Sequence, residues 1–99
     1  MKIPKKIKVG KHKYKVEMRR HSDYKSTMGT TCYDTNTIII GRRCNVSDKK
    51  FPPNEIYDTF WHELTHTILR DMKHPLDNDE KFVTGFANRL TKAILSAEF

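Results

Sequence analysis

The residues of this chain best suited to chemistry are His62-Glu63-Leu64-Thr65-His66, an H-E-x-x-H sequence inside a segment with the apolar spacing of an α-helix. Two histidines four positions apart lie on one helix face about one turn from each other, so both imidazoles can reach a single Zn²⁺. The adjacent glutamate can hold the attacking water as a general base. The spacing predicts that His62 and His66 are zinc ligands and that Glu63 is the catalytic base of a zinc peptidase.

The helix around this motif separates an apolar side from a polar side. At about 100° per residue the two histidines fall near 0° and 40°, and Glu63 falls near 100°. The predicted core side, at about 120–280°, comprises Ile56, Tyr57, Phe60, Trp61, Leu64, Ile68 and Met72. The pentapeptide also occurs by chance on ordinary surface helices, and the separation of the two faces favours a zinc site over that alternative.

A catalytic zinc normally takes three protein ligands and leaves its fourth position to water. The identity of the third ligand therefore decides the subclass of zinc peptidase. The candidates are His74, Asp77, Asp79 and Glu80. Leu69 and Met72 occupy the glycine and third-histidine positions of the longer metzincin motif, which excludes that class. Glu80 is at the start of the second predicted helix and borders the face that packs on the first helix. Its carboxylate can therefore face both histidines. An acidic residue at a helix start is otherwise a surface charge, and Asp79 or His74 could replace Glu80.

The positive charge of the chain is the main observation that favours a function other than a peptidase. The 99 residues include 19 Lys and Arg against 12 Asp and Glu, a net charge of +7. Lysines crowd the beginning of the chain, at positions 2, 5, 6, 8, 11, 13 and 15, where they alternate with apolar residues. A basic surface favours acidic partners, including nucleic acid, but alternation is also typical of the wet face of a half-buried sheet. Without a zinc-finger, helix-turn-helix or RNP-type motif, nucleic-acid binding is possible but not favoured.

The length suits one small domain with a modest core, so residues 1–99 are predicted to form a single domain, strand-rich over 1–45 and helical over 53–97. No apolar run approaches the 18 or more residues of a membrane span, and the basic N-terminal segment lacks the continuous apolar core of a signal peptide. We therefore expect a cytoplasmic chain with no membrane partner. Cys32 and Cys44 lack C-x-x-C spacing and are expected to be free thiols.

Four strands are predicted in the first half of the chain. Residues 5–9 and 13–18 read as one hairpin, and residues 29–33 and 37–41 read as a second hairpin around a polar turn. The last of these strands is rich in β-branched residues and is expected at the centre of the sheet. Residues 19–28 show neither the helical nor the strand period and are predicted to form a loop.

Two helices are predicted in the second half. The first begins at Pro53 or Asn54, because proline is tolerated at a helix start, and it continues to Met72. His74-Pro75 then ends it, because the residue before proline is driven away from α geometry. The second helix follows N-cap candidates at residues 77–79 and reaches about residue 97. Its predicted apolar face comprises Phe82, Val83, Phe86, Ala87, Leu90, Ile94 and Leu95.

These residues resemble a known family. His62-Glu63-Leu64-Thr65-His66 followed by Glu80-x-x-Val83-Thr84-x-Phe86-Ala87-x-x-Leu90 is similar to the zincin-like peptidases of the ImmA/IrrE type, often carried by phages and mobile elements. Their second motif reads approximately E-x-x-A-N-x-F-A-x-x-L. The resemblance covers about the last forty-five residues, and Val83 and Thr84 depart from the family pattern.

The resemblance implies a gluzincin, with His62 and His66 as ligands, Glu80 as the third ligand and Glu63 as the general base. The fold class it implies is α+β, a minimal zincin-like domain in which a small antiparallel-rich sheet precedes the H-E-x-x-H helix and a C-terminal helix. The implied cofactor is Zn²⁺ and the implied partner is a protein or peptide substrate. If a phage encodes the chain, it acts in the cytoplasm of the host cell.

In such a peptidase Zn²⁺ polarises the scissile carbonyl, while Glu63 accepts a proton from water and later delivers it to the leaving amine. An edge strand pairs with the extended substrate, and here residues 29–33 would be that strand. Several side chains could donate a hydrogen bond to the developing oxyanion, and none of them stands out. These donors are Tyr24, Tyr33, Tyr57, Arg70 and His74.

Two other functional classes stay open. One is a zinc-containing protein that acts at nucleic acid, either as a nuclease or as a peptidase of DNA-bound proteins. The three-histidine pattern of small bacterial endoribonucleases does not fit, because Met72 takes the place of the third histidine. The other class is a catalytically silent binding module with a zincin fold.

Overall fold

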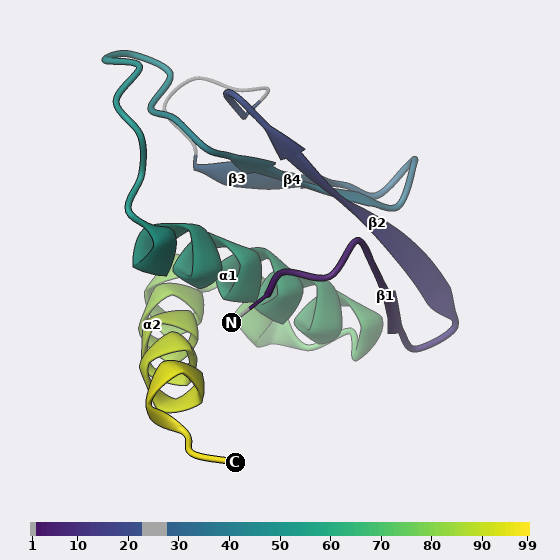
Figure 1. The fold of residues 1–99 in the computed structure, drawn as a ribbon. Helices are drawn as coiled ribbons and strands as arrows, with labels where there is room; N and C mark the ends of the chain where they lie inside the picture. The colour runs from purple at the N-terminus through teal and green to yellow at the C-terminus, as the bar shows by residue number, and fades with distance from the viewer. Residues whose placement is uncertain (1, 23–27) are drawn as a thin grey trace.

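The computed structural model describes residues 2–22 and 28–99, and α1 forms the middle of three layers (Figure 1). The sheet covers one side of this helix and α2 covers the other. The elements in chain order are β1 (Lys6–Val9), β2 (His12–Arg19), β3 (Gly29–Cys32), β4 (Thr37–Gly41), α1 (Pro53–Asp71), the 3₁₀ helix η1 (Pro75–Asn78) and α2 (Glu80–Ser96). This arrangement confirms the predicted α+β class.

The sheet is mixed and has the strand order β1-β2-β4-β3. The pairs β1–β2 and β3–β4 are antiparallel, as the two predicted hairpins require, whereas β2 and β4 are parallel neighbours. β4 therefore lies inside the sheet, and all five of its residues are buried, which confirms its central position. β3 is left at one edge, against α1.

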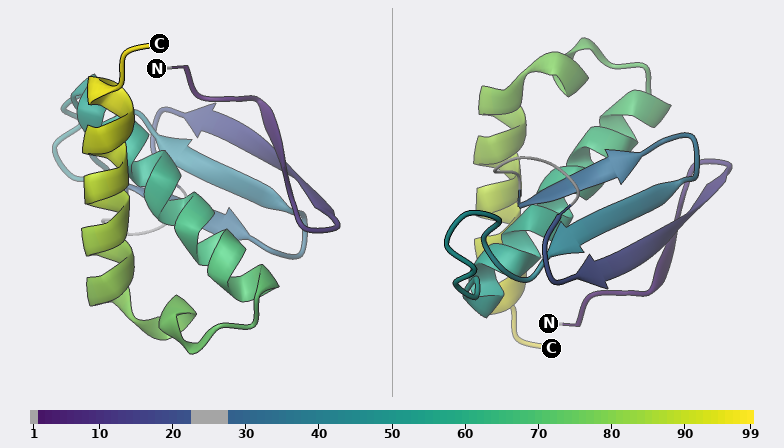
Figure 2. Two further views of the ribbon diagram at one scale, coloured as in Figure 1. Left: turned by 90° about the horizontal axis from the view of Figure 1, so that it is seen from below. Right: turned by 90° about the horizontal axis from the view of Figure 1, so that it is seen from above.

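β2 takes part in two pairings along its length. Residues 12–15 pair with β1 and residues 15–19 pair with β4, so the hairpin of β1 and β2 projects past the end of β4 (Figure 2). Gly10, in the turn of this hairpin, has a φ of +58°, and a side chain there would collide with the Asp71 carboxylate at the end of α1. Glycine adopts this positive φ without the strain that another residue would have, and it leaves room for the Asp71 side chain.

The core lies between the sheet and α1. Ile38 and Ile40 of β4 are fully buried, and they pack in one cluster with Tyr14 of β2 and with Phe60 and Leu64 of α1. Burial of these apolar side chains is the main force that holds α1 on the sheet. The orientation of α1 about its own axis is therefore fixed by its sheet-facing residues.

The predicted apolar side of α1 is correct at Phe60 and Leu64 but wrong at Ile68 and Met72, which are 43% and 61% exposed. The physical reason is that α1 is covered on two sides rather than one. Thr65 and Leu69 lie outside the predicted stripe and are nevertheless buried, because α2 packs against α1. Two separate buried faces leave an open strip between them.

The predicted apolar face of α2 is also too wide. Val83 and Ala87 are fully buried, as predicted, but Phe82, Phe86 and Leu95 are 37%, 47% and 37% exposed. Within the described residues α2 contacts α1 and η1 but no strand, so only one narrow stripe is covered. The Phe82 and Phe86 rings stack on each other at 5.8 Å between centroids.

The helix boundaries agree with the predicted signals to within a residue. Pro53 begins α1, and Lys73, with a φ of +54°, follows its end before His74-Pro75. The side chain of Asp79 accepts a hydrogen bond from the Phe82 amide at 3.0 Å and caps α2. η1 was not predicted. In the predicted loop, residue 19 belongs to β2 and residues 23–27 lie outside the described residues.

Two further expectations concern the membrane and the thiols. Across residues 2–22 and 28–99, neither helix has the length and apolar character that a membrane crossing needs. Cys32 and Cys44 are free thiols, as predicted.

Candidate metal centre

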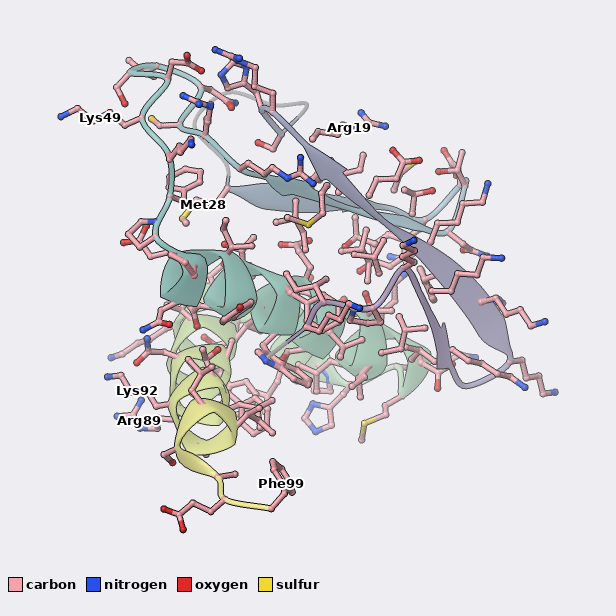
Figure 3. The ribbon with its side chains drawn as sticks, viewed as in Figure 1. Arg19, Met28, Lys49, Arg89, Lys92 and Phe99 are labelled. Atoms are coloured by element: carbon pink, nitrogen blue, oxygen red, sulfur yellow. The ribbon has the colours of Figure 1, made fainter. Side chains whose placement is uncertain are left out.

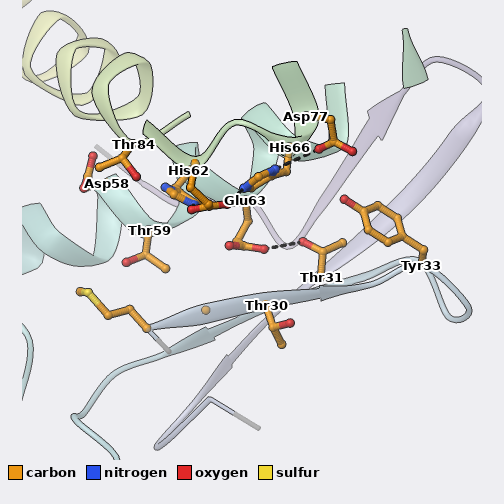
Figure 4. A pocket seen from close by; sticks show the side chains of 13 residues that line it. Thr30, Thr31, Tyr33, Asp58, Thr59, His62, Glu63, His66, Asp77 and Thr84 are labelled. Atoms are coloured by element: carbon orange, nitrogen blue, oxygen red, sulfur yellow. Dashed lines mark hydrogen bonds and ion pairs between the residues drawn. The ribbon is translucent and has the colours of Figure 1, made fainter. Parts of the chain in front are cut away.

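The H-E-x-x-H sequence lies in the second half of α1 and presents both imidazoles on one side of it. The ring centroids of His62 and His66 are 5.0 Å apart, and the two side chains are 22% and 17% exposed. Both rings point toward the beginning of α2 (Figure 4). Their Nε2 atoms are therefore available to a group between the two helices.

Glu80, the first residue of α2, places its carboxylate at both imidazoles. Its Oε2 lies 3.2 Å from Nε2 of His62, and its Oε1 lies 2.5 Å from Nε2 of His66. The three donor groups lie within 4.8 Å of one another. Zinc binds such atoms at about 2.0–2.2 Å, which puts tetrahedral neighbours about 3.3 Å apart, so these residues fit a zinc ion after small shifts. Their role as ligands stays a prediction.

The alternative third ligands have other partners. Asp79 caps α2, and His74 accepts a hydrogen bond from the Leu76 amide to its Nδ1 at 3.1 Å. Neither belongs to the group of side chains in the described part of the chain whose donor atoms lie close enough together to hold a metal ion. Glu80 is the acidic residue that the fold brings to the two histidines.

Asp77 has a role that the sequence did not reveal. Nδ1 of His66 donates a hydrogen bond to Asp77 Oδ1 at 2.9 Å, because a carboxylate can only accept. A proton held on Nδ1 leaves Nε2 as the metal-binding nitrogen, which is how outer carboxylates orient histidine ligands. Burial lowers the pKa of His66, but the hydrogen bond to Asp77 and the Glu80 carboxylate outweigh it, so the pKa is raised. η1 carries Asp77 into this contact, and no local pattern predicted that short helix.

Glu63 points to the sheet side of the site rather than to α2. Thr31 of β3 donates its hydroxyl to Glu63 Oε1 at 2.8 Å, a bond drawn in Figure 4. Burial raises the pKa of Glu63, and the Thr31 hydrogen bond opposes that shift. A carboxylate with a raised pKa is a stronger proton acceptor, as a general base requires.

Gly29 lets the edge strand approach this glutamate closely. A Cβ at Gly29 would lie 2.6 Å from Thr59 Cγ2 and 3.5 Å from Glu63 Cγ. Any larger residue would push β3 away from α1, which would lengthen the Thr31–Glu63 hydrogen bond. A glycine within a strand is the sequence signal that marks such an approach.

The donor groups open into a cleft of about 680 Å³. β3 forms one wall of this cleft, and α1 with the beginning of α2 forms the other (Figure 4). Besides the groups already described, the lining includes Met28, Thr30, Asp58 and Thr84. The cleft can therefore admit an extended chain along β3.

Tyr33 is the predicted oxyanion donor that lines this cleft. Burial raises its pKa, so the phenol keeps its proton, and the Arg70 guanidinium lies 3.9 Å from the ring centroid. His74 is engaged in η1, and Tyr57 is not among the cleft residues. Tyr24 lies outside the described residues.

Comparisons with family models, with curated proteins and with solved structures found no match for this chain.

The three-residue centre predicts about one zinc per chain. His66→Ala and Glu80→Ala should each lower zinc affinity by more than the roughly 10–100-fold that loss of an outer hydrogen-bond partner costs. Elemental analysis after dialysis, with a competing chelator to rank affinities, measures this.

His74→Ala and Asp79→Ala are the matched controls, because each removes a rejected third ligand. The Asp79 variant should lose about 1 kcal/mol of stability with its helix cap, yet keep its zinc. Loss of zinc in the His74 variant but not in the Glu80 variant would overturn the assignment.

The hydrogen bond between His66 and Asp77 generates a second prediction. Asp77→Ala should lower zinc affinity roughly 10–100-fold, because the His66 ring loses the partner that fixes its tautomer and direction. Asp77→Asn keeps an acceptor oxygen and should fall between this variant and the wild type. Chelator competition measures both, and an affinity unchanged in Asp77→Ala would show that the contact does not orient the ligand.

Proposed function

We propose that this chain is a zinc peptidase of the gluzincin type, with His62, His66 and Glu80 as ligands and Glu63 as general base. The observation that supports it is the convergence of two imidazoles of α1 with the first carboxylate of α2, beside a buried glutamate and an edge strand. The same convergence supports the resemblance to ImmA/IrrE-type peptidases.

Each residue has a defined task in this reaction. Zinc bound at the centre would polarise the scissile carbonyl and make the attacking water more acidic. Glu63 takes the proton of that water and passes it to the leaving amine, which breaks the peptide bond into a carboxylate and an amine. Thr31 holds the Glu63 carboxylate, and Tyr33, which lines the cleft, would donate its hydroxyl hydrogen to the developing oxyanion.

The edge strand supplies the binding surface for substrate. The Gly41 amide donates to the Met28 carbonyl at 2.9 Å, so residues 28 and 41 form a hydrogen-bonded antiparallel pair. Such pairs alternate along the ladder, which leaves the backbone groups of Gly29 and Thr31 directed away from β4. These groups can pair with an extended peptide laid along the cleft, so the substrate is an unfolded or flexible segment.

Glu63→Gln tests the chemistry. Glutamine keeps the size and accepts the Thr31 hydrogen bond, but it cannot take up a proton, so zinc and fold should be retained while cleavage falls by about 10²–10⁴-fold. Cleavage of a proteome-derived peptide library, followed by mass spectrometry, is measured beside the zinc content of the same preparation.

Cleavage that survives this substitution would rule out Glu63 as the base. A wild-type protein that holds zinc but cleaves no peptide would favour the silent binding module.

Thr31 provides a graded test of how the base is held. Thr31→Val should lower kcat by about 10-fold or more, because a hydrogen bond to a charged group contributes roughly 1.5–3 kcal/mol. Thr31→Ser keeps the hydroxyl and should restore most of the activity. Zinc content and KM should change little in both variants. Equal losses in the Ser and Val variants would mean that the hydroxyl does not position Glu63.

A further inference from the structure

The whole net charge of +7 comes from the first 16 residues. This segment holds seven of the 19 Lys and Arg residues and none of the 12 Asp and Glu residues, so the remaining 83 residues carry 12 of each. Most of the segment forms β1 and the first part of β2. The excess positive charge is therefore concentrated on one hairpin.

Four of these lysines lie together on the outer face of the hairpin. The strand register puts Lys6 opposite Lys15 and Lys8 opposite Lys13, and all four are exposed. The alternate residues point inward, where Tyr14 joins the core. We call Lys6, Lys8, Lys13 and Lys15 the lysine ribbon.

The lysine ribbon does not stabilise the fold. Like charges directly opposite each other in an antiparallel pair are destabilising. Here both cross-strand pairs, which we call the rungs of the hairpin, consist of two lysines. Within residues 2–22 and 28–99, no carboxylate forms an ion pair with any of the four. The basic residues at the other end of β2 differ, because Arg20 and His21 both contact Asp48.

The ribbon is also well placed to reach a partner. The first three residues of β2 pair with β1 alone, so this part of the hairpin extends beyond β4 as two strands (Figure 1). None of the large exposed apolar side chains of the described residues lies on it. The cleft is bounded by β3, at the opposite edge of the sheet, and stays open.

We propose that the lysine ribbon binds the phosphate backbone of duplex nucleic acid. A duplex offers one negative charge per about 1.7 Å of axis, and its major groove admits a two-stranded β-ribbon. Surfaces that bind lipid usually add apolar side chains to their basic ones, and this face has none. Lysines that contact phosphates position a protein without reading sequence, so the binding is independent of base sequence. It would hold the cleft near proteins that occupy nucleic acid.

The test is binding of the zinc-loaded chain to a fluorescein-labelled 20-base-pair DNA duplex, followed by anisotropy over a salt series. Four phosphate contacts predict a slope of about −3.6 in log K against log salt, which is roughly a 100-fold loss of affinity between 50 and 200 mM. No binding at 50 mM salt would overturn the proposal.

Lys6→Glu combined with Lys13→Glu is the informative variant. Each rung then pairs one glutamate with one lysine, so the midpoint of thermal unfolding should rise while DNA affinity at 50 mM salt falls at least ~10-fold and the salt slope approaches zero. If this variant does not fold, Lys→Gln at all four positions carries the same expectation for DNA affinity and slope.

Lys49→Glu combined with Lys92→Glu is the matched control, because it changes the net charge equally. Figure 3 shows Lys49 in the loop before α1 and Lys92 on α2, both away from the hairpin. This control should keep the wild-type slope, and an equal loss of DNA affinity in it would refute a local site. Stronger binding to phosphatidylserine vesicles than to the duplex at the same salt would also refute the proposal.

Discussion

The packing of α2 on α1 is the interaction on which the candidate centre depends. Val83 and Ala87 are fully buried where α2 packs on α1, and this packing sets the approach of the two helices. That approach brings the Glu80 carboxylate to within 2.5 and 3.2 Å of the two imidazole nitrogens. Asp77, carried by η1 between the helices, reaches the other nitrogen of His66 because the connection is short and begins at the end of α1.

The side of α1 that faces the sheet positions Glu63, the proposed base. The apolar cluster under the sheet fixes the rotation of this helix, and that rotation turns Glu63 toward β3 while the histidines face α2. Gly29 then sets how near the edge strand comes. A helix packed on two sides can therefore turn the proposed metal ligands toward one neighbour, α2, and the proposed base toward the other, β3. The exposure of Ile68 and Met72 is a consequence of the same double packing.

The lysine ribbon and the cleft lie on different faces and at different edges of the sheet. The lysine ribbon lies on the outer face at the β1 edge, and the cleft lies on the inner side at the β3 edge. The sequence pattern predicted that these lysines would alternate with core residues, which is correct, but it did not reveal that they would stand opposite one another. Their pairing follows from the two-residue turn at residues 10–11, because the length and type of a hairpin turn set the register of its two strands.

The sequence by itself determined the four strands and the two α-helices, because their signals are local: strand alternation, the proline at the start of α1, and the Asp79 cap. It also placed His62 and His66 on one face, since four residues make about one helical turn. Tertiary structure decided the parallel pairing of β2 with β4 and the contacts of Asp77 and Thr31. It also decided that Glu80, rather than His74 or Asp79, lies at the two histidines of α1. Each of these joins residues from different elements. Their distances depend on how buried faces pack, which side-chain volume and loop geometry fix only in the folded chain.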